Sequence, residues 1–231
     1  MSTMSDIIGK AIGEGRKHLL EHEAKALCAE YEIPVTKVEL AKNEPEAAKL
    51  AKQIGFPVVL KIVSPDIIHK SDVGGVITNI KTEKAVQLAY ARIIANIERN
   101  MPNASIVGIL IQEMAPQSTE VIIGTIKDPQ FGPTLMFGLG GIFVEILKDV
   151  TFRIAPITKD EAHEMITEVK AYPILKGYRN MPRADTEALV KILLNTSRLV
   201  TEHQEIKEID LNPIMVYEKG AKVVDARIIL E

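Results

Sequence analysis

Residues 56–63 (FPVVLKIV) and 69–75 (HKSDVGG) decide how we interpret this sequence. The first stretch is an apolar run with a single charge, Lys61, and is typical of a buried strand. The second is a small-residue turn, in which glycines let backbone N–H groups approach an anion while the nearby lysine supplies a positive charge. These two stretches predict a grip for the phosphates of ATP or ADP, with His69 at its edge.

Each residue of this grip also has an ordinary structural explanation. Lys61 fits a lysine that extends its ammonium from a strand edge to solvent, and the pair Gly74-Gly75 alone indicates only a turn. His69 by itself fits a polar loop residue. A neutral imidazole nitrogen is nevertheless a good nucleophile near neutral pH, so His69 is also a candidate to carry a phosphoryl group.

Length and composition indicate a soluble protein with a substantial core. The chain has 231 residues, of which 46% are hydrophobic and 26% are charged, as in ordinary globular proteins. The net charge of −3 without a basic block argues against nucleic acid as a partner. The single cysteine, Cys28, excludes an internal disulfide. We find no signal peptide and no apolar run long enough to cross a bilayer, and therefore expect a cytoplasmic protein without membrane contacts.

The spacing of apolar residues predicts helices and strands in mixed order. Helices are expected to begin near residue 20 and at the capping residues Asn43, Thr82, Thr158 and Asp185. Strands are expected over residues 35–40, 56–63, 76–80, 106–113, 120–126, 134–137, 151–157, 206–216 and 222–230. Because strict alternation of strands and helices is missing, the pattern favours an α+β fold.

Pro116 lies between two predicted strands, in a position that suits a hinge between lobes. We therefore divide the chain into an N-terminal lead (residues 1–18), a first lobe (19–113) and a second lobe (114–231). The lead has no steady periodicity and fits a poorly ordered segment or a short helix. Four residues around the hinge could meet adenine and ribose: Gln112, Glu113, Met114 and Glu120.

Acidic side chains near the C-terminus form the most informative group. Glu208, Asp210 and Asn212 share one face of a predicted strand because side chains alternate along a strand. Asp225 lies in the next predicted strand, between valine and alanine. A charged strand that faces solvent explains Glu208 well, but it explains Asp225 poorly because burial of an unpaired carboxylate is costly. We favour a site for Mg²⁺ that bridges nucleotide phosphates.

Two further motifs are less specific. His18 and His22 stand one helical turn apart, but no third ligand has suitable spacing, so a solvated helix face is the better interpretation. Residues 138–141 (GLGG) lack the spacing of a dinucleotide-binding fingerprint, and no helix is expected to open after them. This segment fits a loop that contacts a substrate or partner through its backbone, or equally a flexible turn.

Taken together, these motifs resemble those of the ATP-grasp fold. More narrowly, residues 20–25 (LEHEAK), 69–76, 137–145, 152–156 (FRIAP) and 208–213 are similar to the β subunit of ADP-forming acetyl-CoA (acyl-CoA) synthetases. The likeness covers residues 15–231 approximately. The related β subunit of succinyl-CoA synthetase shares an Asn-Pro pair and a later aspartate, which match Asn212 and Asp225, but it carries a further CoA-ligase domain.

This resemblance implies two lobes, with the nucleotide bound between two largely antiparallel sheets. It implies an acid–thiol ligase that catalyses acyl-CoA + ADP + phosphate ⇌ carboxylate + CoA + ATP and is active only with a separate α subunit. That subunit would bind CoA and the acyl group and carry phosphate on its own histidine. This chain would pass the phosphoryl group to ADP with the help of Mg²⁺, in a heterotetramer of two α and two β subunits.

The resemblance also implies roles for individual residues. His69 matches a histidine proposed as a second phosphoryl carrier, and Arg153 or Arg227 would neutralise the phosphoryl group in transfer. Nucleotide binding would involve Lys61, Ser71, Gly74, Gly75, Gln112, Glu113, Met114 and Glu120. Asn212 and Asp225 would bind Mg²⁺, with Asp210 behind them. Because His69 must meet both the partner's phosphohistidine and ADP, residues 64–75 are expected to move.

Two other functions are compatible with part of this pattern. A self-contained ATP-grasp carboxylate ligase would need an additional N-terminal domain for its acyl substrate, and the short lead argues against it. A nucleotide-sensing module without turnover would not need both a nucleophilic histidine and a metal-binding pair.

Overall fold

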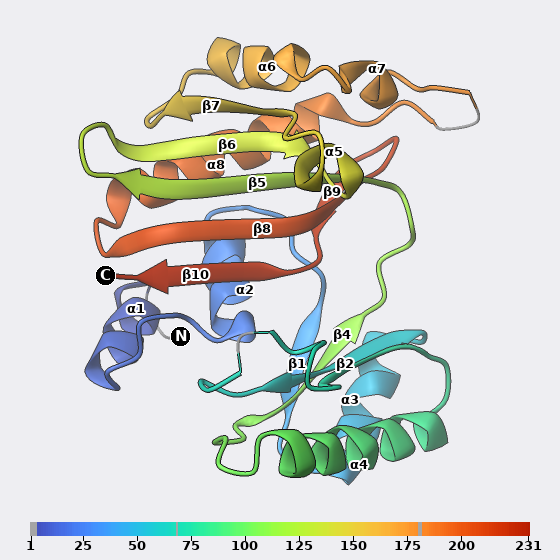
Figure 1. The fold of residues 1–231 in the computed structure, drawn as a ribbon. Helices are drawn as coiled ribbons and strands as arrows, with labels where there is room; N and C mark the ends of the chain where they lie inside the picture. Colours follow the sequence, from blue (N-terminus) through green and yellow to red (C-terminus); the bar gives the residue numbers. More distant parts are fainter. Residues whose placement is uncertain (1–3, 68, 180–181) are drawn as a thin grey trace. The chain divides into compact units, whose positions relative to one another are not determined.

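The computed structural model describes residues 4–67, 69–179 and 182–231. The chain separates into two compact units (Figure 1). The smaller unit is Thr36–Ala115, and the larger unit combines the N-terminal segment that ends at Val35 with Pro116–Glu231. The chain passes between the units at residues 115 and 116, whereas the sequence pattern placed the second lobe from residue 114.

The smaller unit is an antiparallel sheet with helices on one face. Its strands are β1 (Val38–Ala41), β2 (Val58–Val63), β3 (Val76–Ile80) and β4 (Gly108–Glu113), in the order β1-β4-β2-β3. The helices α3 (Glu44–Ile54) and α4 (Glu83–Asn100) cover one side of this sheet (Figure 1). Val58, Leu60 and Ile62 of β2 pack against their apolar residues in a single core.

The ends of these helices follow from local chemistry. The side chain of Asn43 accepts a hydrogen bond from the Glu46 N–H (3.0 Å), and that of Thr82 accepts one from the Ala85 N–H (3.2 Å). Both side chains therefore satisfy N–H groups that a helix start leaves without partners. Gly55 ends α3 with a φ of 98°, which glycine adopts readily. The predicted helix starts at Asn43 and Thr82 are confirmed.

The larger unit contains a sheet with strand order β10-β8-β5-β6-β7, and β9 pairs with β8. Its strands are β5 (Thr119–Asp128), β6 (Gly132–Leu139), β7 (Val150–Ile154), β8 (Ile206–Val216), β9 (Ala221–Val223) and β10 (Ala226–Leu230). Its helices are α1 (Met4–Gly13), α2 (Glu21–Glu30), α5 (Ile142–Glu145), α6 (Lys159–Glu168), α7 (Tyr172–Leu175) and α8 (Thr186–Glu202). In Figure 1, α8 runs behind this sheet, and its apolar residues share one core with alternate residues of the strands.

The N-terminal segment packs differently from the predicted division. Residues 19–35 were assigned to the first lobe, but Ala24, Leu27 and Tyr31 of α2 belong to the core of the larger unit. Ile8 and Ala11 of α1 are buried in the same core, so the lead has a structural role, although residues 1–3 lie outside the described part. The apolar stripe of α2 indicates that the helix is buried, but it does not indicate which sheet buries it.

Two local predictions near the site are wrong. The strand expected over residues 222–230 is broken, because Val224 and Asp225 lie between β9 and β10. The Val224 N–H still donates to the carbonyl of Pro213 (2.9 Å), so the broken segment remains joined to β8. The short helix α5 follows Gly141 directly, where no helix was expected. Among the described residues, no helix has the length and apolar character needed to span a membrane.

Asp185 joins α8 to the turn that precedes β9, and this contact gives a first prediction. Its carboxylate accepts hydrogen bonds from the N–H groups of Ala188 (3.0 Å) and Gly220 (2.7 Å). Asp185→Ala removes both, and loss of such a cap typically costs about 1–2 kcal/mol. We expect a decrease of that size in the free energy of unfolding, measured in urea at pH 7. Glu187→Ala, in the exposed first turn of α8, is the control and should change stability by less than about 0.5 kcal/mol.

The same contact predicts a pH dependence. The Gly220 N–H is the main reason that the pKa of Asp185 lies below its ordinary value of 3.8. A carboxyl group with a lowered pKa stabilises the fold above its ordinary pKa and loses this contribution as pH falls through the lowered value. The difference between the wild type and Asp185→Ala should therefore be constant near neutrality and shrink in acid. A constant difference into strong acid would contradict this explanation.

Candidate functional site

The acidic residues of β8 form one face of the larger sheet. Ile209 and Leu211 point into the core, so the alternation of side chains places Glu208, Asp210 and Asn212 on the opposite face. Glu208 and Asp210 are half-buried, and Asn212 is exposed. The shared face that the sequence predicted is confirmed by this arrangement. We call these three residues, together with Asp225 and Arg227, the acidic face.

Arg227 of β10 lies directly beside this row. It is paired with Asp210 in the antiparallel register. Its Nη2 lies 2.7 Å from Oε1 of Glu208 and 3.7 Å from Oδ2 of Asp210. Arg227 therefore offsets part of the negative charge that the strand concentrates here.

Asp225 stands opposite Asn212, outside regular strand pairing. The Asn212 N–H donates to the carbonyl oxygen of Asp225 (3.2 Å). The Ala226 N–H lies 3.2 Å from Oδ1 of Asp225, so the carboxylate is held close to its own backbone. The sequence placed Asp225 inside a strand, but the residue is half-buried in the break between β9 and β10. Asp225 therefore lies next to Asn212 through a backbone hydrogen bond, without the regular pairing of a pleated strand.

The electrostatics of the acidic face favour a cation. Burial is the largest cause that raises the pKa of Asp210 above its ordinary value, and repulsion from Glu208 and Asp225 raises it further. Arg227 acts in the opposite direction. Removal of water thus disfavours the charged carboxylate, and one arginine does not fully compensate. A bound cation would relieve the repulsion that remains.

The donor set fits magnesium that is shared with a phosphate ligand. Within the described residues, no group of three or more His, Cys, Asp or Glu side chains could hold a metal by itself. Asn212 and Asp225 offer an amide oxygen and a carboxylate on neighbouring chain segments. Mg²⁺ commonly takes one or two protein carboxylates and completes its shell with phosphate oxygens and water. The pair is therefore adequate for a magnesium–nucleotide complex and too small for a metal bound by protein alone.

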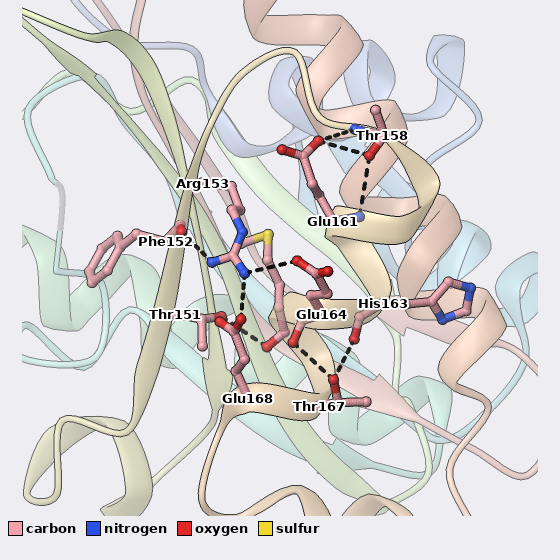
Figure 2. Close-up of polar contacts among 10 residues, drawn as sticks. Thr151, Phe152, Arg153, Thr158, Glu161, His163, Glu164, Thr167 and Glu168 are labelled. Carbon is pink, nitrogen blue, oxygen red and sulfur yellow. Dashed lines mark hydrogen bonds and ion pairs between the residues drawn. The ribbon is translucent and has the colours of Figure 1, made fainter.

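Arg153, the other predicted phosphoryl-binding arginine, lies on the opposite face of the sheet. It is paired with Leu135, whose side chain is in the core, so both point toward the helices. Its Nη2 contacts Glu168 (2.6 Å) and Glu164 (3.3 Å) of α6, as Figure 2 shows. The structure therefore does not bring Arg153 to the acidic face. Its two ion pairs instead attach β7 to α6.

In the smaller unit, Lys61 and Gln112 occupy the sheet face that points away from α3 and α4. Val58, Leu60 and Ile62 point to the helical core, so Lys61 points to the other side. Gln112 pairs with Val59, which places it on the same face. Lys61 is 7% exposed and Gln112 is 1% exposed. The alternative of a lysine that reaches solvent from a strand edge is therefore wrong.

The glycine pair does not form the predicted phosphate cradle. The Gly74 N–H donates to the carbonyl of Ser71 (3.1 Å), and the Gly75 N–H donates to that of Lys70 (2.8 Å). Both amides are thus already used inside the loop. A Cβ on Gly75 would lie 2.5 Å from Cγ2 of Ile62, so this glycine is required for close packing instead.

His69 is an exposed loop residue between two anchored segments. Before it, the Ser105 N–H donates to Asp66 (2.7 Å). After it, the side-chain amide of Asn96 in α4 donates to the carbonyl of Gly74 (2.9 Å). These anchors limit the movement predicted for residues 64–75, of which Ile68 lies outside the described part. The exposed imidazole of His69 remains accessible to a partner.

The residues predicted around adenine and ribose divide between the two units. In the smaller unit, Oε1 of Glu113 accepts a hydrogen bond from the Lys37 N–H (3.0 Å), and the Met114 N–H donates to Pro57 (3.2 Å). Glu120 is exposed on β5 of the larger unit, and its carbonyl accepts a hydrogen bond from the Gly140 N–H (2.8 Å). The segment 138–141 therefore packs beside a predicted ribose contact.

Lys25 lies next to the acidic face, although the sequence predictions assign it no role. Its Nζ donates to the carbonyl of Val224 (2.8 Å), the residue directly before Asp225. A charge beside the apolar stripe of α2, four residues after Glu21, was the available signal. The sequence does not show that this lysine is buried or that it reaches a segment about 200 residues away.

Comparison with known proteins establishes the class to which this architecture belongs. A family model of the ATP-grasp domain matches residues 10–230, so this is an ATP-grasp protein. The chain is 54% identical to the β subunit of acetate–CoA ligase [ADP-forming] I from Pyrococcus furiosus, over 97% of each chain. The chain belongs to the β subunits of ADP-forming acetyl-CoA synthetases, which are ligases, and the resemblance seen in the sequence is confirmed.

Two other relatives extend this comparison. Acetate–CoA ligase [ADP-forming] I of Archaeoglobus fulgidus is 48% identical over 97% of this chain, which spans 33% of that longer protein. An acetyl-coenzyme A synthetase of Ca. Korarchaeum cryptofilum superimposes with a TM-score of 0.97 at 56% identity, covering 99% of this chain and 100% of that one, in a complex with coenzyme A and Ca-AMPCP. Another structure of that protein contains coenzyme A and Mg-AMPPCP, with its phosphohistidine segment pointing towards the nucleotide binding site.

The electrostatics of the acidic face predict the behaviour of Arg227→Met. A carboxyl group with a raised pKa stabilises the fold below its ordinary pKa and loses this contribution as pH rises through the raised value. Without Arg227, the pKa of Asp210 should rise further. The variant should therefore lose more unfolding free energy at pH 8 than at pH 4, measured in urea.

Asp210→Asn in the Arg227→Met background provides the control for this prediction. It removes the carboxyl group that titrates and should reduce the difference between the two pH values. Equal destabilisation of Arg227→Met at both pH values would show that Arg227 acts through packing and not through charge.

Proposed function

We propose that this chain binds ADP with Mg²⁺ and exchanges a phosphoryl group between the nucleotide and a histidine of the partner α subunit. The observation that carries this proposal is the juxtaposition of Asn212 and Asp225 on a face that also holds Arg227. Its acidic groups suit Mg²⁺, and its arginine suits a phosphate. In the forward reaction, acyl-CoA, ADP and phosphate would yield carboxylate, CoA and ATP.

Asn212 and Asp225 would be the protein ligands of the metal. The Mg-AMPPCP complex of the Ca. Korarchaeum cryptofilum protein supports magnesium as the natural ion. When bound, Mg²⁺ would neutralise charge on the nucleotide phosphates. Asp210 would lie behind these ligands, where burial raises its pKa most and the charges of Glu208 and Asp225 raise it further.

Arg227 would neutralise the phosphoryl group in transfer. Its Nη2 is paired with Glu208. Its Nε is buried and has no hydrogen-bond partner among the described residues. A buried donor without an acceptor is costly, and a phosphate oxygen would remove that cost. For this role we favour Arg227 over Arg153, because α6 occupies the guanidinium of Arg153.

The smaller unit would supply further contacts to the nucleotide. Lys61 would place a charge near the α-phosphate, and burial on a sheet face would make this charge effective. Gln112, Glu113 and Met114 would contact adenine through strand β4 and the residue after it, and Glu120 would contact the ribose. Ser71 is an exposed residue of the His69 loop and would approach the phosphates, while Gly74 and Gly75 would shape that loop.

His69 would carry the phosphoryl group between partner and nucleotide. A ring nitrogen of His69 would attack the phosphorus of the partner's phosphohistidine, so that one P–N bond forms as the other breaks. A β-phosphate oxygen of ADP would then attack the same phosphorus and release His69, which yields ATP. The exposure of His69 supports this role.

Direct transfer is a second route that a specific observation favours. In the Ca. Korarchaeum cryptofilum protein, the phosphohistidine segment itself points towards the nucleotide binding site. If the partner's segment travels this far, no second carrier is required. The two routes differ in whether His69 is ever phosphorylated.

The partner would be an α subunit that binds CoA and the acyl group. The Pyrococcus furiosus relative is named as a β subunit, and the longer Archaeoglobus fulgidus relative contains the matching region within a single chain. We propose an assembly of two α and two β subunits. A mass of one copy of each subunit, measured by native mass spectrometry, would overturn this stoichiometry.

Labelling with [γ-³²P]ATP and Mg²⁺ tests the relay. The full chain, alone and in complex with its α subunit, should acquire acid-labile and base-stable label on His69. His69→Asn should lose the label on this chain and lose ATP synthesis by more than about 100-fold, because the nucleophile is removed. His163→Asn is the matched control, since His163 is a partly exposed histidine on α6, and it should label normally.

The result also separates the two routes. An unlabelled wild-type chain in an active complex, together with full activity of His69→Asn, would exclude the relay and support direct transfer. Absence of ATP synthesis in the wild-type complex would contradict the proposed function itself.

The metal assignment is tested by Asp225→Asn. Loss of a ligand carboxylate should weaken Mg²⁺-dependent ADP binding at least 10-fold, because Mg²⁺ strongly prefers charged oxygen ligands. Calorimetric titration of the chain with ADP, with and without Mg²⁺, measures the change. Lys222→Gln, in the neighbouring β9, is the control. Unchanged metal dependence in Asp225→Asn would remove Asp225 from the site.

A further inference from the structure

Helix α2 buries an ion pair beneath the segment that carries Asp225. Lys25 is 0% exposed and Glu21 is 5% exposed. Nζ of Lys25 lies 3.0 Å from Oε1 of Glu21, one turn earlier on the same helix. The same ammonium donates a hydrogen bond of 2.8 Å to the carbonyl of Val224. A charged pair is thus placed in the core and aimed at the break between β9 and β10.

The stability of the fold does not explain this arrangement well. Two charges lose their hydration on burial, and apolar residues of similar volume often stabilise a core as much as a buried ion pair does. Ala24 and Leu27, which are near Lys25 on α2, are apolar residues that are buried in this core. The distinctive property of Lys25 is its long reach to a main-chain carbonyl outside the helix.

The carbonyl that Lys25 binds belongs to the peptide unit that leads into Asp225. The peptide unit between Val224 and Asp225 is planar, so a fixed Val224 oxygen also fixes the Asp225 nitrogen and Cα. The Val224 N–H donates to Pro213 (2.9 Å), and the Asp225 carbonyl accepts from Asn212 (3.2 Å). Both of these contacts come from β8. Lys25 adds a contact from the opposite side, so the segment is held between the helix and the strand.

We propose that Lys25 is a positioning residue for the magnesium site, with Glu21 as the counter-ion that makes its burial tolerable. Lys25 does not touch the metal or the nucleotide. It fixes the Val224 carbonyl and thereby restricts the backbone from which the Asp225 carboxylate projects. This inference rests on the proposed function, in which Asp225 and Asn212 bind Mg²⁺.

The experiment compares Glu21→Gln with the double variant Glu21→Gln/Lys25→Met in the full chain. Glu21→Gln removes the charge pair but keeps the lysine, which retains N–H donors for Val224 whether or not it is charged. The double variant has a neutral, apolar side chain of similar length at position 25 and no donor for Val224. The single variant Lys25→Met is avoided because it would leave Glu21 as a buried carboxylate without its cation, which is strongly destabilising.

Two measurements report on the site itself. Electron paramagnetic resonance of Mn²⁺ with ADP gives the metal affinity, and calorimetry without metal gives the intrinsic affinity for ADP. The double variant should bind Mn²⁺ about 10–100-fold more weakly than Glu21→Gln, the range typical of groups that orient metal ligands. Affinity for ADP without metal should be the same in both. Amide exchange at Asn212 should accelerate in the double variant only, because its acceptor is the Asp225 carbonyl.

The outcomes separate this inference from the function on which it rests. If Asp225→Asn weakens Mn²⁺ binding but the double variant binds as tightly as Glu21→Gln, Lys25 has only a structural role and the inference is wrong. If Asp225→Asn also binds Mn²⁺ normally, the metal assignment fails and the inference fails with it. The double variant could also be less stable, with its metal-free affinity for ADP reduced as much as its affinity for Mn²⁺. That result would indicate general unfolding and would also contradict a positioning role.

Discussion

The alternation of side chains along β8 is the constraint on which the acidic face depends. Ile209 and Leu211 are almost fully buried in the core of the larger unit. A shift of one residue would expose them and force Asp210 and Asn212 into the core. The neighbours β5 and β10 pair with β8 on both sides and fix this register. Hydrophobic burial on one face thus determines where the charges lie on the other.

The two faces of the larger sheet therefore differ: one packs in the core, and the other carries the acidic face. The helices of the larger unit cover the face of the sheet that contains its apolar residues. The opposite face can therefore hold carboxylates that repel one another, because the core lies on the other side of the strands. Burial raises the pKa of Asp210 most, repulsion from Glu208 and Asp225 adds to this, and Arg227 acts in the opposite direction. A cation bound at this face, as proposed, would offset the negative charge of these carboxylates.

Sequence reasoning recovered what local patterns determine. The alternation over 206–216 reproduced β8, and the capping residues Asn43, Thr158 and Asp185 each begin a helix in the structure. These features depend on neighbours within a few residues. The family resemblance supplied the two-sheet fold and the function, because its motifs are specific only in combination.

The failures concern contacts between distant segments. Arg153 stands in a plausible motif, but its strand register turns it toward Glu164 and Glu168. The predicted helix near residue 20 forms as α2, yet residues 19–35 complete the core of the unit that contains Pro116–Glu231. The amides of Gly74 and Gly75 find acceptors within their own loop. In each case the sequence indicates the chemical groups that are present, but the contacts of those groups depend on residues far away in the sequence or on the local fold of the loop.

The break between β9 and β10 is one place where a contact with a distant segment determines the local backbone. In an uninterrupted strand, the ladder of backbone hydrogen bonds would fix the orientation of Asp225, and no other contact would be required. The break removes part of that ladder, so carbonyl groups there need other partners. Lys25 satisfies the one at Val224 from the core side. If Asp225 binds a metal as proposed, the hydrogen bond from Lys25 would replace part of the support that the backbone ladder gives elsewhere.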